Sequence, residues 1–513
     1  MSVDVPPTLT LPRTRTRRPL APRFLPAPTG APSRLDQLLT RALTSQAIWL
    51  SPVLVLQAAM CLRLRDRLTG SESLYLRTGH QLIAHLLHGT PIDAGRVSGV
   101  TTWYAVPPAA LQTLGGTWLV HAVGTMLILL ATVFLYLASR RLFGHGAALI
   151  AAAVFASSPA TVVAARAINF DAPCLLILAV ALYLATRATQ HVVYPVLIGG
   201  LVAVAAPESY FALVAVPGLM TVIWVAGSPR ARRRRTQVIV ALAGLAAVLT
   251  SLVAAATVSN QHWQGPSSNS VGDSLSANSH LAMLHACWTT IGPLAVAGAI
   301  AIVLLPRRRL FASAVLVTAL TPLVIQAGLG ESTSLHRNTA YCALFLGPLI
   351  GVAGMSLVRR GRWLVGRVPV ALAAIVLVLS SGFGASSAAV DSWPVSATFG
   401  ALVHQYVGPT SSRFLLDDST VPASELSRVT VHHPWIDAGA PRFLTARGSD
   451  QLVNDVRDGA YSLVLYSNQG PSPGSSRAVL AALRDRYTLI ATVPASAGNA
   501  HTNLSLWIGE LPR

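Results

Sequence analysis

The chain has 513 residues, of which 52% are hydrophobic and only 11% are charged. A soluble globular domain carries about 25% charged residues, so this composition excludes an ordinary cytosolic enzyme. A net charge of +19 is typical of nucleic-acid-binding proteins, but the basic residues, all of them arginine, form no basic stripe, and we expect no nucleic-acid partner.

Residues 1–45 are rich in Pro, Arg, Thr and Ala and contain no sustained apolar run. This composition predicts a disordered basic tail. The first apolar run begins near Gln46, which is too far along the chain for a cleavable signal peptide.

Residues 46–385 contain recurring apolar runs, each long enough to cross about 30 Å of hydrocarbon at about 1.5 Å per helical residue. We predict eleven transmembrane helices, near 46–62, 117–138, 146–165, 172–188, 192–206, 209–226, 236–257, 286–305, 310–326, 339–358 and 366–385. The sequence therefore predicts an α-helical polytopic membrane protein.

The arginines predict how this helical region is oriented. The connections after the even-numbered spans hold fifteen arginines and no acidic residue. Arg63, Arg65 and Arg67 point the other way, but seven arginines in the tail outnumber them. By the positive-inside rule the N-terminus is cytoplasmic, and the chain after residue 385 lies outside the plasma membrane.

The acidic residues of the predicted membrane region all fall at outer ends or in outer loops. There are seven, namely Asp66, Glu72, Asp93, Asp171, Glu208, Asp273 and Glu331. Acidic residues weigh little in topology, so they had no part in placing the spans. The outer face is therefore where we expect a reaction site.

The extramembrane segments differ from one another. The first outer loop, 63–116, contains SLYLRTGHQLIAHLLHG, whose apolar residues at helical spacing predict an amphipathic helix along the interface. The loop 258–283 is polar. Residues 386–513 contain strand-like runs (RFLLDD, YSLVLYS, YTLIATVP, LSLWIGE) and two helical segments, which predict a small extracytoplasmic α/β domain.

Glu72 and Asp171 are the first two candidates for chemistry. Glu72 has two interpretations. It is either an acid in the first turn of a helix that Ser71 caps, or a general base near the low-dielectric boundary of the membrane. Asp171, in ARAINFDAPC, lies at the mouth of a span with Arg166 five residues before it. Asp171 could cap the helix that follows it. Ionisable residues at membrane depth tend to be functional, however, and we favour a functional role for Asp171.

The remaining candidates lie later in the chain. Glu208, in APESYFA, suits either a packed corner or a site residue. Glu331, His336 and Arg337 share the short loop GESTSLHRNTAY. An outer arginine suits either the binding of an anionic phosphate or snorkelling at the interface, and His336 is more typical of an interfacial polar residue.

Metal and nucleotide sites are not expected. The four cysteines are far apart in apolar runs, with no pairing that suggests a disulfide framework or a metal centre. The sequence contains no phosphate-binding glycine motif of the kind that ATP-driven pumps use.

The order of these features resembles the GT-C membrane glycosyltransferases of family 39, which include protein O-mannosyltransferases and the aminoarabinose transferase of lipid A. The resemblance covers about residues 46–385. It is carried by the stretches SESLYLRTGHQLIAHLLHG, WYAVPPAALQTLGGTWLVHAVGTMLILLATVFLYLASRRLFG, FDAPCLLILAVALYLATR and SLHRNTAYCALFLGPLIG. It implies a polyprenyl-phosphate sugar as donor, an extracytoplasmic acceptor hydroxyl, inversion at the sugar and no further cofactor.

The resemblance also implies roles for single residues. Glu72 matches the second acid of the family's Asp-Glu pair, and Asp171 matches the family's second acidic motif. Arg337, beside His336, matches the lysine that contacts the lipid phosphate. The resemblance implies that Glu72, Asp171 and Asp66 are the catalytic carboxylates, with Glu72 or Asp66 in place of the family's first Asp as the base. The outer cavity is expected to include Ser71, Tyr75, Glu208, Glu331 and Asn338.

Three departures from the family pattern stand in these stretches. Ser71 occupies the place of the family's first Asp, Asn338 replaces an expected His, and His121 stands where relatives often have Arg. A serine does not accept a proton at neutral pH as a carboxylate does. The leading hypothesis is a glycosyltransferase; the alternative is a catalytically degenerate relative that binds lipid-linked sugar or scaffolds envelope assembly.

Overall fold

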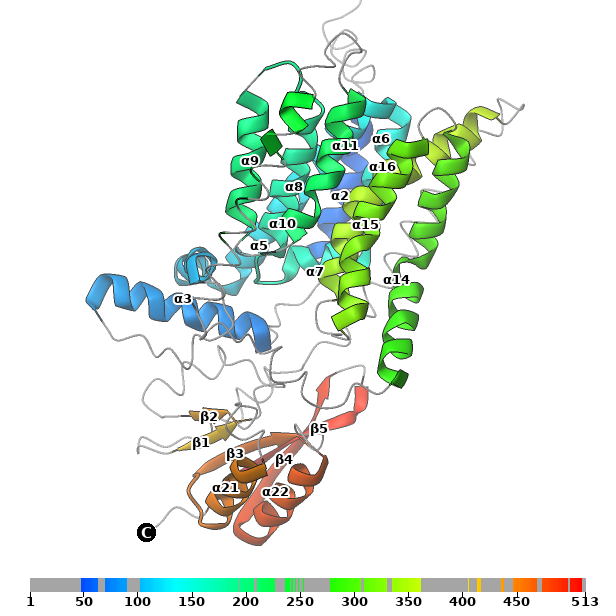
Figure 1. Cartoon of the computed structure of the whole chain (residues 1–513). Coiled ribbons are helices and arrows are strands. Elements are labelled where there is room, and N and C mark those ends of the chain that lie inside the picture. The colour runs from blue at the N-terminus through cyan, green and yellow to red at the C-terminus, as the bar shows by residue number, and fades with distance from the viewer. Residues whose placement is uncertain are drawn as a thin grey trace, which may run out of the picture. The chain divides into compact units, whose positions relative to one another are not determined.

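The computed structural model describes an α-helical part between residues 48 and 360 and an α/β part between residues 413 and 509 (Figure 1). The residues described are 48–62, 70–89, 102–191, 193–206, 209, 211–226, short pieces between 236 and 252, 277–305, 309–329, 335–360, 405, 413–416, 435–437, 446–467, 473–496 and 499–509. The predicted tail 1–45 and the predicted eleventh span 366–385 lie outside them.

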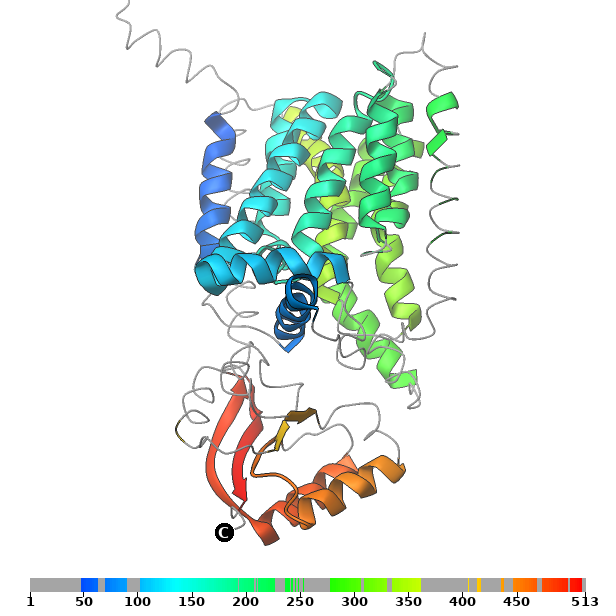
Figure 2. The ribbon, with the colours of Figure 1, turned by 90° about the vertical axis from the view of Figure 1, so that its left-hand side faces the viewer.

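The helical part is a succession of apolar helices joined by short connections. In chain order these are η1 (Ile48–Leu50), α2 (Ser51–Leu62), α3 (Gly70–His88), α5 (Thr102–Phe143), α6 (His145–Ser157), α7 (Pro159–Arg166), α8 (Asp171–Ala185), α9 (Val193–Ala205), α10 (Phe211–Val214), α11 (Val216–Ala226), α14 (Ala277–Leu304), α15 (Arg309–Leu329) and α16 (Leu335–Arg360). Most of them stand side by side in one bundle (Figures 1 and 2).

Length and apolar composition identify some of these helices as candidate membrane spans. Among the described residues, Tyr104–Phe143 and Asn338–Ser356 qualify alone, and His145–Ser157 with Pro159–Arg166 qualifies as a bent pair. Six further apolar helices of 10–17 residues fall short of that length. A polytopic helical architecture is therefore supported, while the number of eleven spans stays a prediction.

Helix α3 lies crosswise to the bundle (Figure 1) and confirms the helix predicted within SLYLRTGHQLIAHLLHG. Its Leu76 is fully buried, whereas Leu86 and Leu87 near its C-terminal end are 73% and 70% exposed. Gly79 brings the backbone close to α5, because a Cβ at this position would lie 2.0 Å from the carbonyl oxygen of Ala105. The missing side chain is what allows this approach.

Helix α5 is broken into two arms at Gly115 and Gly116. Gly116 has φ 70° and ψ −173°, a conformation essentially confined to glycine. A straight helix of 42 residues would be about 63 Å long, twice the thickness of a bilayer core. The break instead lays the first arm, 102–114, across the bundle and stands the second arm upright (Figure 2).

The first arm of α5 was not predicted as a helix. The sequence predicts residues 63–116 as an outer loop with a single helix, and Pro107 and Pro108 disfavour a helix where the first arm forms. The arm forms nevertheless, packed against α3 through Ala105 and Ala109. Tertiary packing thus outweighs the local cost of the prolines.

The predicted span 146–165 is two helices, α6 and α7, that meet at 61°. Ser158, between them, has an extended backbone (φ −62°, ψ 123°), and Pro159 begins α7. The residue before a proline is disfavoured in the helical region, which accounts for the bend. It directs α7 toward α8 and the second arm of α5.

Small residues join α16 to α6. A Cβ on Gly351 would lie 2.1 Å from the carbonyl oxygen of Ala147, and one on Gly347 would lie 3.1 Å from that of Ala151. Because position 351 meets 147 and position 347 meets 151, the two helices run antiparallel. The beginning of α16 is therefore directed toward α7, and these two helices are in contact.

The α/β part contains a five-stranded sheet in the order β2-β1-β3-β5-β4. Its strands are β1 (Phe414–Leu416), β2 (Trp435–Asp437), β3 (Leu463–Ser467), β4 (Tyr487–Ser496) and β5 (Asn499–Gly509). β1 pairs parallel with β2 and β3, and β5 pairs antiparallel with β3 and β4. Helices α21 (Ala446–Arg457) and α22 (Pro473–Arg486) share an apolar core with the sheet.

Candidate functional site

The candidate site is built around the turn of residues 167–170, which joins the end of α7 to the start of α8. Three side chains form hydrogen bonds with the backbone of this turn or of the residues on either side of it. Glu72 accepts a hydrogen bond from the amide of Ile168, His121 donates one to the carbonyl of Arg166, and Asn169 accepts one from the amide of Asp171. The turn is therefore held from two other helices.

Glu72 lies in the first turn of α3 with only 2% of its surface exposed. Its Oε1 atom is 2.8 Å from the backbone nitrogen of Ile168, a residue 96 positions later in the chain. A carboxylate is a strong acceptor for a backbone amide, and a buried turn needs such partners. Glu72 is therefore an acid at the start of its helix, and it also contacts the turn that leads into the predicted second acidic motif.

His121 lies early in the second arm of α5 and is 1% exposed. Its Nδ1 atom is 2.6 Å from the carbonyl oxygen of Arg166. A carbonyl oxygen only accepts hydrogen bonds, so Nδ1 must carry the proton. The backbones of α5 and α7 pack closely next to it. A Cβ on Gly124 of α5 would lie only 2.6 Å from the carbonyl oxygen of Ala165, near the end of α7.

Asp171 is the first residue of α8 and is 5% exposed. The N-cap position of this helix is Phe170, which makes no side-chain hydrogen bond there. The amide of Asp171 is instead 3.0 Å from Oδ1 of Asn169. Asp171 is therefore one position after the N-cap, and its carboxylate lies in the first turn, where the helix dipole favours an anion.

Apolar contacts hold the same elements together. Leu76 of α3, Val120 of α5 and Ile168 of the turn form one buried cluster, with Leu111 of the first arm packed against it. The rings of Tyr104 and Phe170 meet edge to face, with their centroids 5.1 Å apart. The turn thus contacts α3 and both arms of α5.

The beginning of α16 supplies a second set of buried polar groups. Asn338 and Thr339 are 0% and 1% exposed. The hydroxyl of Tyr341 is 3.3 Å from that of Ser209, and the ring of Tyr341 stacks on Phe211 with centroids 4.8 Å apart. These contacts join the start of α16 to the segment around α10, and α16 also contacts α7, α5 and α8.

The remaining predicted site residues are placed only in part. Tyr75 is half-buried in α3. Ser71 lies in the first turn of α3, and His336 and Arg337 lie in the first turn of α16, but their side chains are outside what the structure describes. Asp66, Glu208 and Glu331 are outside the described residues. Among the residues described, no group of His, Cys, Asp and Glu has the arrangement of a metal site.

Sequence reasoning missed the parts played by three residues of the turn and its surroundings. His121 was noted only as a departure from a family pattern, Asn169 was not considered, and Arg166 was noted only as a neighbour of Asp171. Arg166 is 3% exposed. The available signal was a polar or charged side chain within or beside an apolar helix, which is costly in a membrane and tends to be functional.

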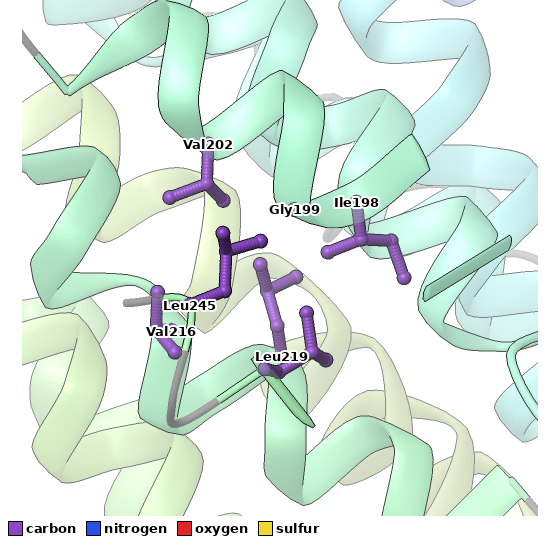
Figure 3. Close-up of a pocket in the computed structure, with 7 residues that line it drawn as sticks. Ile198, Gly199, Val202, Val216, Leu219 and Leu245 are labelled. Atoms are coloured by element: carbon purple, nitrogen blue, oxygen red, sulfur yellow. The ribbon is translucent and has the colours of Figure 1, made fainter. Parts of the chain in front are cut away.

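An apolar hollow lies elsewhere in the bundle, between α9, α11 and residues 242 and 245 (Figure 3). Its empty volume is about 250 Å³, and its walls are Ile198, Gly199, Val202, Val216, Leu219, Leu242 and Leu245. None of these side chains ionises or forms strong hydrogen bonds. These lining residues therefore offer no group for acid–base chemistry.

Comparison with known proteins finds a family model that is similar to the part of the chain containing the turn. Residues 109–256 match the family model described as dolichyl-phosphate-mannose-protein mannosyltransferase. The matched stretch contains His121, Arg166 and Asp171, while Glu72 precedes it. No curated protein matches the chain.

Two solved structures share the fold. ArnT from Cupriavidus metallidurans in the apo state superposes with a TM-score of 0.52 at 15% sequence identity, covering 90% of this chain and 97% of ArnT. The archaeal oligosaccharyltransferase AglB from Archaeoglobus fulgidus, in complex with an inhibitory peptide and a dolichol-phosphate, superposes with a TM-score of 0.51 at 13% identity, covering 86% of this chain and 73% of AglB. The family match and the shared fold confirm the predicted resemblance: the chain has the GT-C fold and is similar to family 39 of the membrane glycosyltransferases.

Proposed function

We propose that the protein transfers a sugar from a polyprenyl-phosphate-linked donor to an acceptor hydroxyl on the outer side of the plasma membrane, with inversion at the anomeric carbon. The observation that carries this proposal is the buried carboxylate of Asp171, which lies in the first turn of α8 beside a turn held by two other helices. The description of the matched family names dolichyl-phosphate-mannose, and AglB was solved with a dolichol-phosphate. Both support a lipid phosphate as the sugar carrier.

In this scheme Asp171 acts as the general base. Its carboxylate takes the proton of the acceptor hydroxyl while that oxygen attacks the anomeric carbon from the face opposite the phosphate. The bond from that carbon to the phosphate oxygen breaks, and the phosphate leaves with the electron pair. One displacement inverts the anomeric centre, and the donor's own leaving group makes a further cofactor unnecessary.

A cation near the donor phosphate would stabilise the charge that develops as it leaves. We propose Arg337, with His336, for this role, because both lie in the first turn of α16 and this helix contacts α7 and α8. Ser71, Tyr75, Glu208, Glu331 and Asn338 remain the proposed surroundings of the substrates, and Asp66 remains a second proposed base.

Loss of the Asp171 carboxylate tests the proposal. Purified full-length protein in lipid nanodiscs is incubated with radiolabelled polyprenyl-phosphate sugars and envelope extract, and transferred label is counted. We expect Asp171→Asn to lower turnover about a hundredfold or more, because general bases contribute on that scale. The matched control is Asp450→Asn, which changes an exposed aspartate in α21 in the same way and should retain wild-type turnover.

Transfer that survives in Asp171→Asn at nearly the wild-type rate would show that this carboxylate is not the base. Adding Glu72→Gln extends the test to the other buried carboxylate at the turn. If the double variant still transfers sugar normally, the assignment of the site to this turn is wrong.

The second candidate function is that of a degenerate relative that binds lipid-linked sugar without transferring it. The observation that favours it is Ser71, which stands where the family pattern has its first Asp. Ser71→Asp separates the two functions. A large gain of transfer from an inactive parent would support degeneracy, whereas an active parent that gains little would support the glycosyltransferase.

A further inference from the structure

The turn at residues 167–170 has few ways to satisfy its buried backbone groups by itself. Within the segment, the amide of Ala167 bonds to the carbonyl of Val163 and the carbonyl of Phe170 accepts from the amide of Cys174, which ties both ends of the turn to α7 and α8. The amide of Ile168, within the turn, and the carbonyl of Arg166, just before it, are bonded by side chains from outside the segment. The path of the turn therefore depends on Glu72 and His121.

The two outside bonds have opposite chemistry. Glu72 accepts at 2.8 Å from an amide, and His121 donates at 2.6 Å to a carbonyl only two residues earlier. They come from different helices, α3 and α5. Together they fix both the position and the rotation of the peptide units that lead into Asp171, since a rotation that improved one bond would displace the other.

Resting on the proposed function, we propose that Glu72 and His121 are positioning residues: they form a two-point clamp on the turn that aims the Asp171 carboxylate at the acceptor. Glu72 therefore works through a hydrogen bond to the backbone and does not take the proton of the substrate. The Nδ1–H form of His121 is the one that the clamp requires. Both side chains are almost fully buried, as a clamp of this kind needs to be.

The chemistry of each bond defines matched variants. Glutamine at position 72 keeps an oxygen that accepts from Ile168, whereas methionine has a similar length and offers no such acceptor. Asparagine at position 121 places an amide N–H near the position of Nδ1, whereas glutamine places it near Nε2 and leucine has none. If the clamp exists, glutamine at position 72 should hold the turn better than methionine does. At position 121, asparagine should hold it better than glutamine or leucine does.

A readout that does not depend on activity is hydrogen exchange of the amides in the turn. Full-length protein in nanodiscs is exchanged into heavy water, and the peptide that covers residues 166–171 is followed by mass spectrometry. We expect exchange of the turn to quicken about tenfold in Glu72→Met and His121→Leu, the effect of losing one net hydrogen bond. Glu72→Gln and His121→Asn should stay closer to the wild type.

The structure offers a matched control for the loss of an imidazole. His80 of α3 lies eight residues beyond Glu72 and is hydrogen-bonded to Gln112 of α5 at 2.8 Å. His80→Leu therefore removes a bond between the same two helices, and exchange of the turn should remain at the wild-type rate. If His80→Leu quickens exchange as much as His121→Leu does, the effect is general loosening of α3 against α5, and the clamp is not supported.

Transfer kinetics test the link to Asp171. The clamp predicts that Glu72→Met lowers kcat more than it changes KM, and that it causes little further loss in an Asp171→Asn background, because both act through one carboxylate. A loss in Glu72→Gln as large as that in Asp171→Asn, with unchanged exchange of the turn, would overturn the clamp and make Glu72 the base. A wild-type protein without any transfer would defeat the proposed function, while the exchange results would still decide whether the clamp exists.

Discussion

At the scale of single residues, the decisive feature is how hydrogen bonds are shared at the start of α8. Oδ1 of Asn169 accepts a hydrogen bond from the amide of Asp171, which is the first residue of the helix. Asparagine is among the residues most suited to this task. In the sequence NFD, the side chain of Asn169 thus bonds to the amide of the residue to which we assign the chemistry, two positions later.

Gly116 is the residue whose conformation decides the course of α5. At φ 70° and ψ −173° an alanine would be strained by about 1–3 kcal/mol. We expect Gly116→Ala to lower the thermal unfolding temperature of the detergent-solubilised protein, followed by tryptophan fluorescence. The expected loss arises from the backbone alone, because nothing lies within 4 Å of a Cβ at this position.

The control for Gly116→Ala is Gly200→Ala. A Cβ on Gly200 of α9 also has nothing within 4 Å, and the backbone there is helical. This substitution should be neutral or slightly stabilising, since alanine is favoured over glycine within a helix. Equal unfolding temperatures for the two variants would contradict a special role for the kink.

At the scale of helices, close approach explains why α16 and α6 run together. Their contact is made of glycines and alanines, which allow two backbones to come near each other without large side chains between them. The same principle brings Gly79 of α3 against α5 and Gly124 of α5 against α7. Small residues thus assemble the helices that surround the turn.

Gly351 and Gly354 form a matched pair that tests this packing. A Cβ on Gly351 meets a backbone carbonyl at 2.1 Å, whereas one on Gly354 meets only the end of the Ile150 side chain at 3.1 Å. We expect Gly351→Ala to destabilise the protein by about 1–3 kcal/mol, the usual cost of overpacking, and Gly354→Ala to cost less. Chemical denaturation in mixed micelles measures both, and the reverse order would disprove the close contact.

At the scale of the whole molecule, the arginines predict which side of the membrane each end occupies. Fifteen of them lie in connections after even-numbered spans, and positively charged loops are retained in the cytoplasm. Alkaline phosphatase folds only outside the cytoplasm, so a fusion after Arg513 should be active and a fusion after Arg235 inactive. Activity in the opposite order would invert the proposed orientation.

Much of the helical part follows from hydrophobic patterns, because long apolar runs have few alternatives in a membrane. The amphipathic pattern likewise predicts α3, and four short strand-like runs of apolar residues predict β1, β3, β4 and β5. The first arm of α5 and the bend at Ser158 were missed, since prolines and tertiary contacts decide them. β2, with the sequence WID, lies outside these four runs.

The candidate site was predictable as a set of residue types but not as an arrangement. Glu72 and Asp171 stand out as rare acids in an apolar chain, which is a signal that needs no structure. Which atoms bond to Ile168 and to Arg166 depends on how α3 and α5 fold back over the turn. Spacing along the chain carries no information about a bond that spans 96 positions.

The 96 positions between Glu72 and Ile168 also set an order of events during biogenesis. At ribosomal speeds of about 5–20 residues per second, the carboxylate of Glu72 waits roughly 5–20 seconds before its backbone partner has been synthesised. Until then the bond cannot form, although α3 can already pack against α5, which is synthesised earlier than Ile168. The candidate site is consequently one of the last features of this half of the protein to form, and a nascent chain stopped before α8 has no site at all.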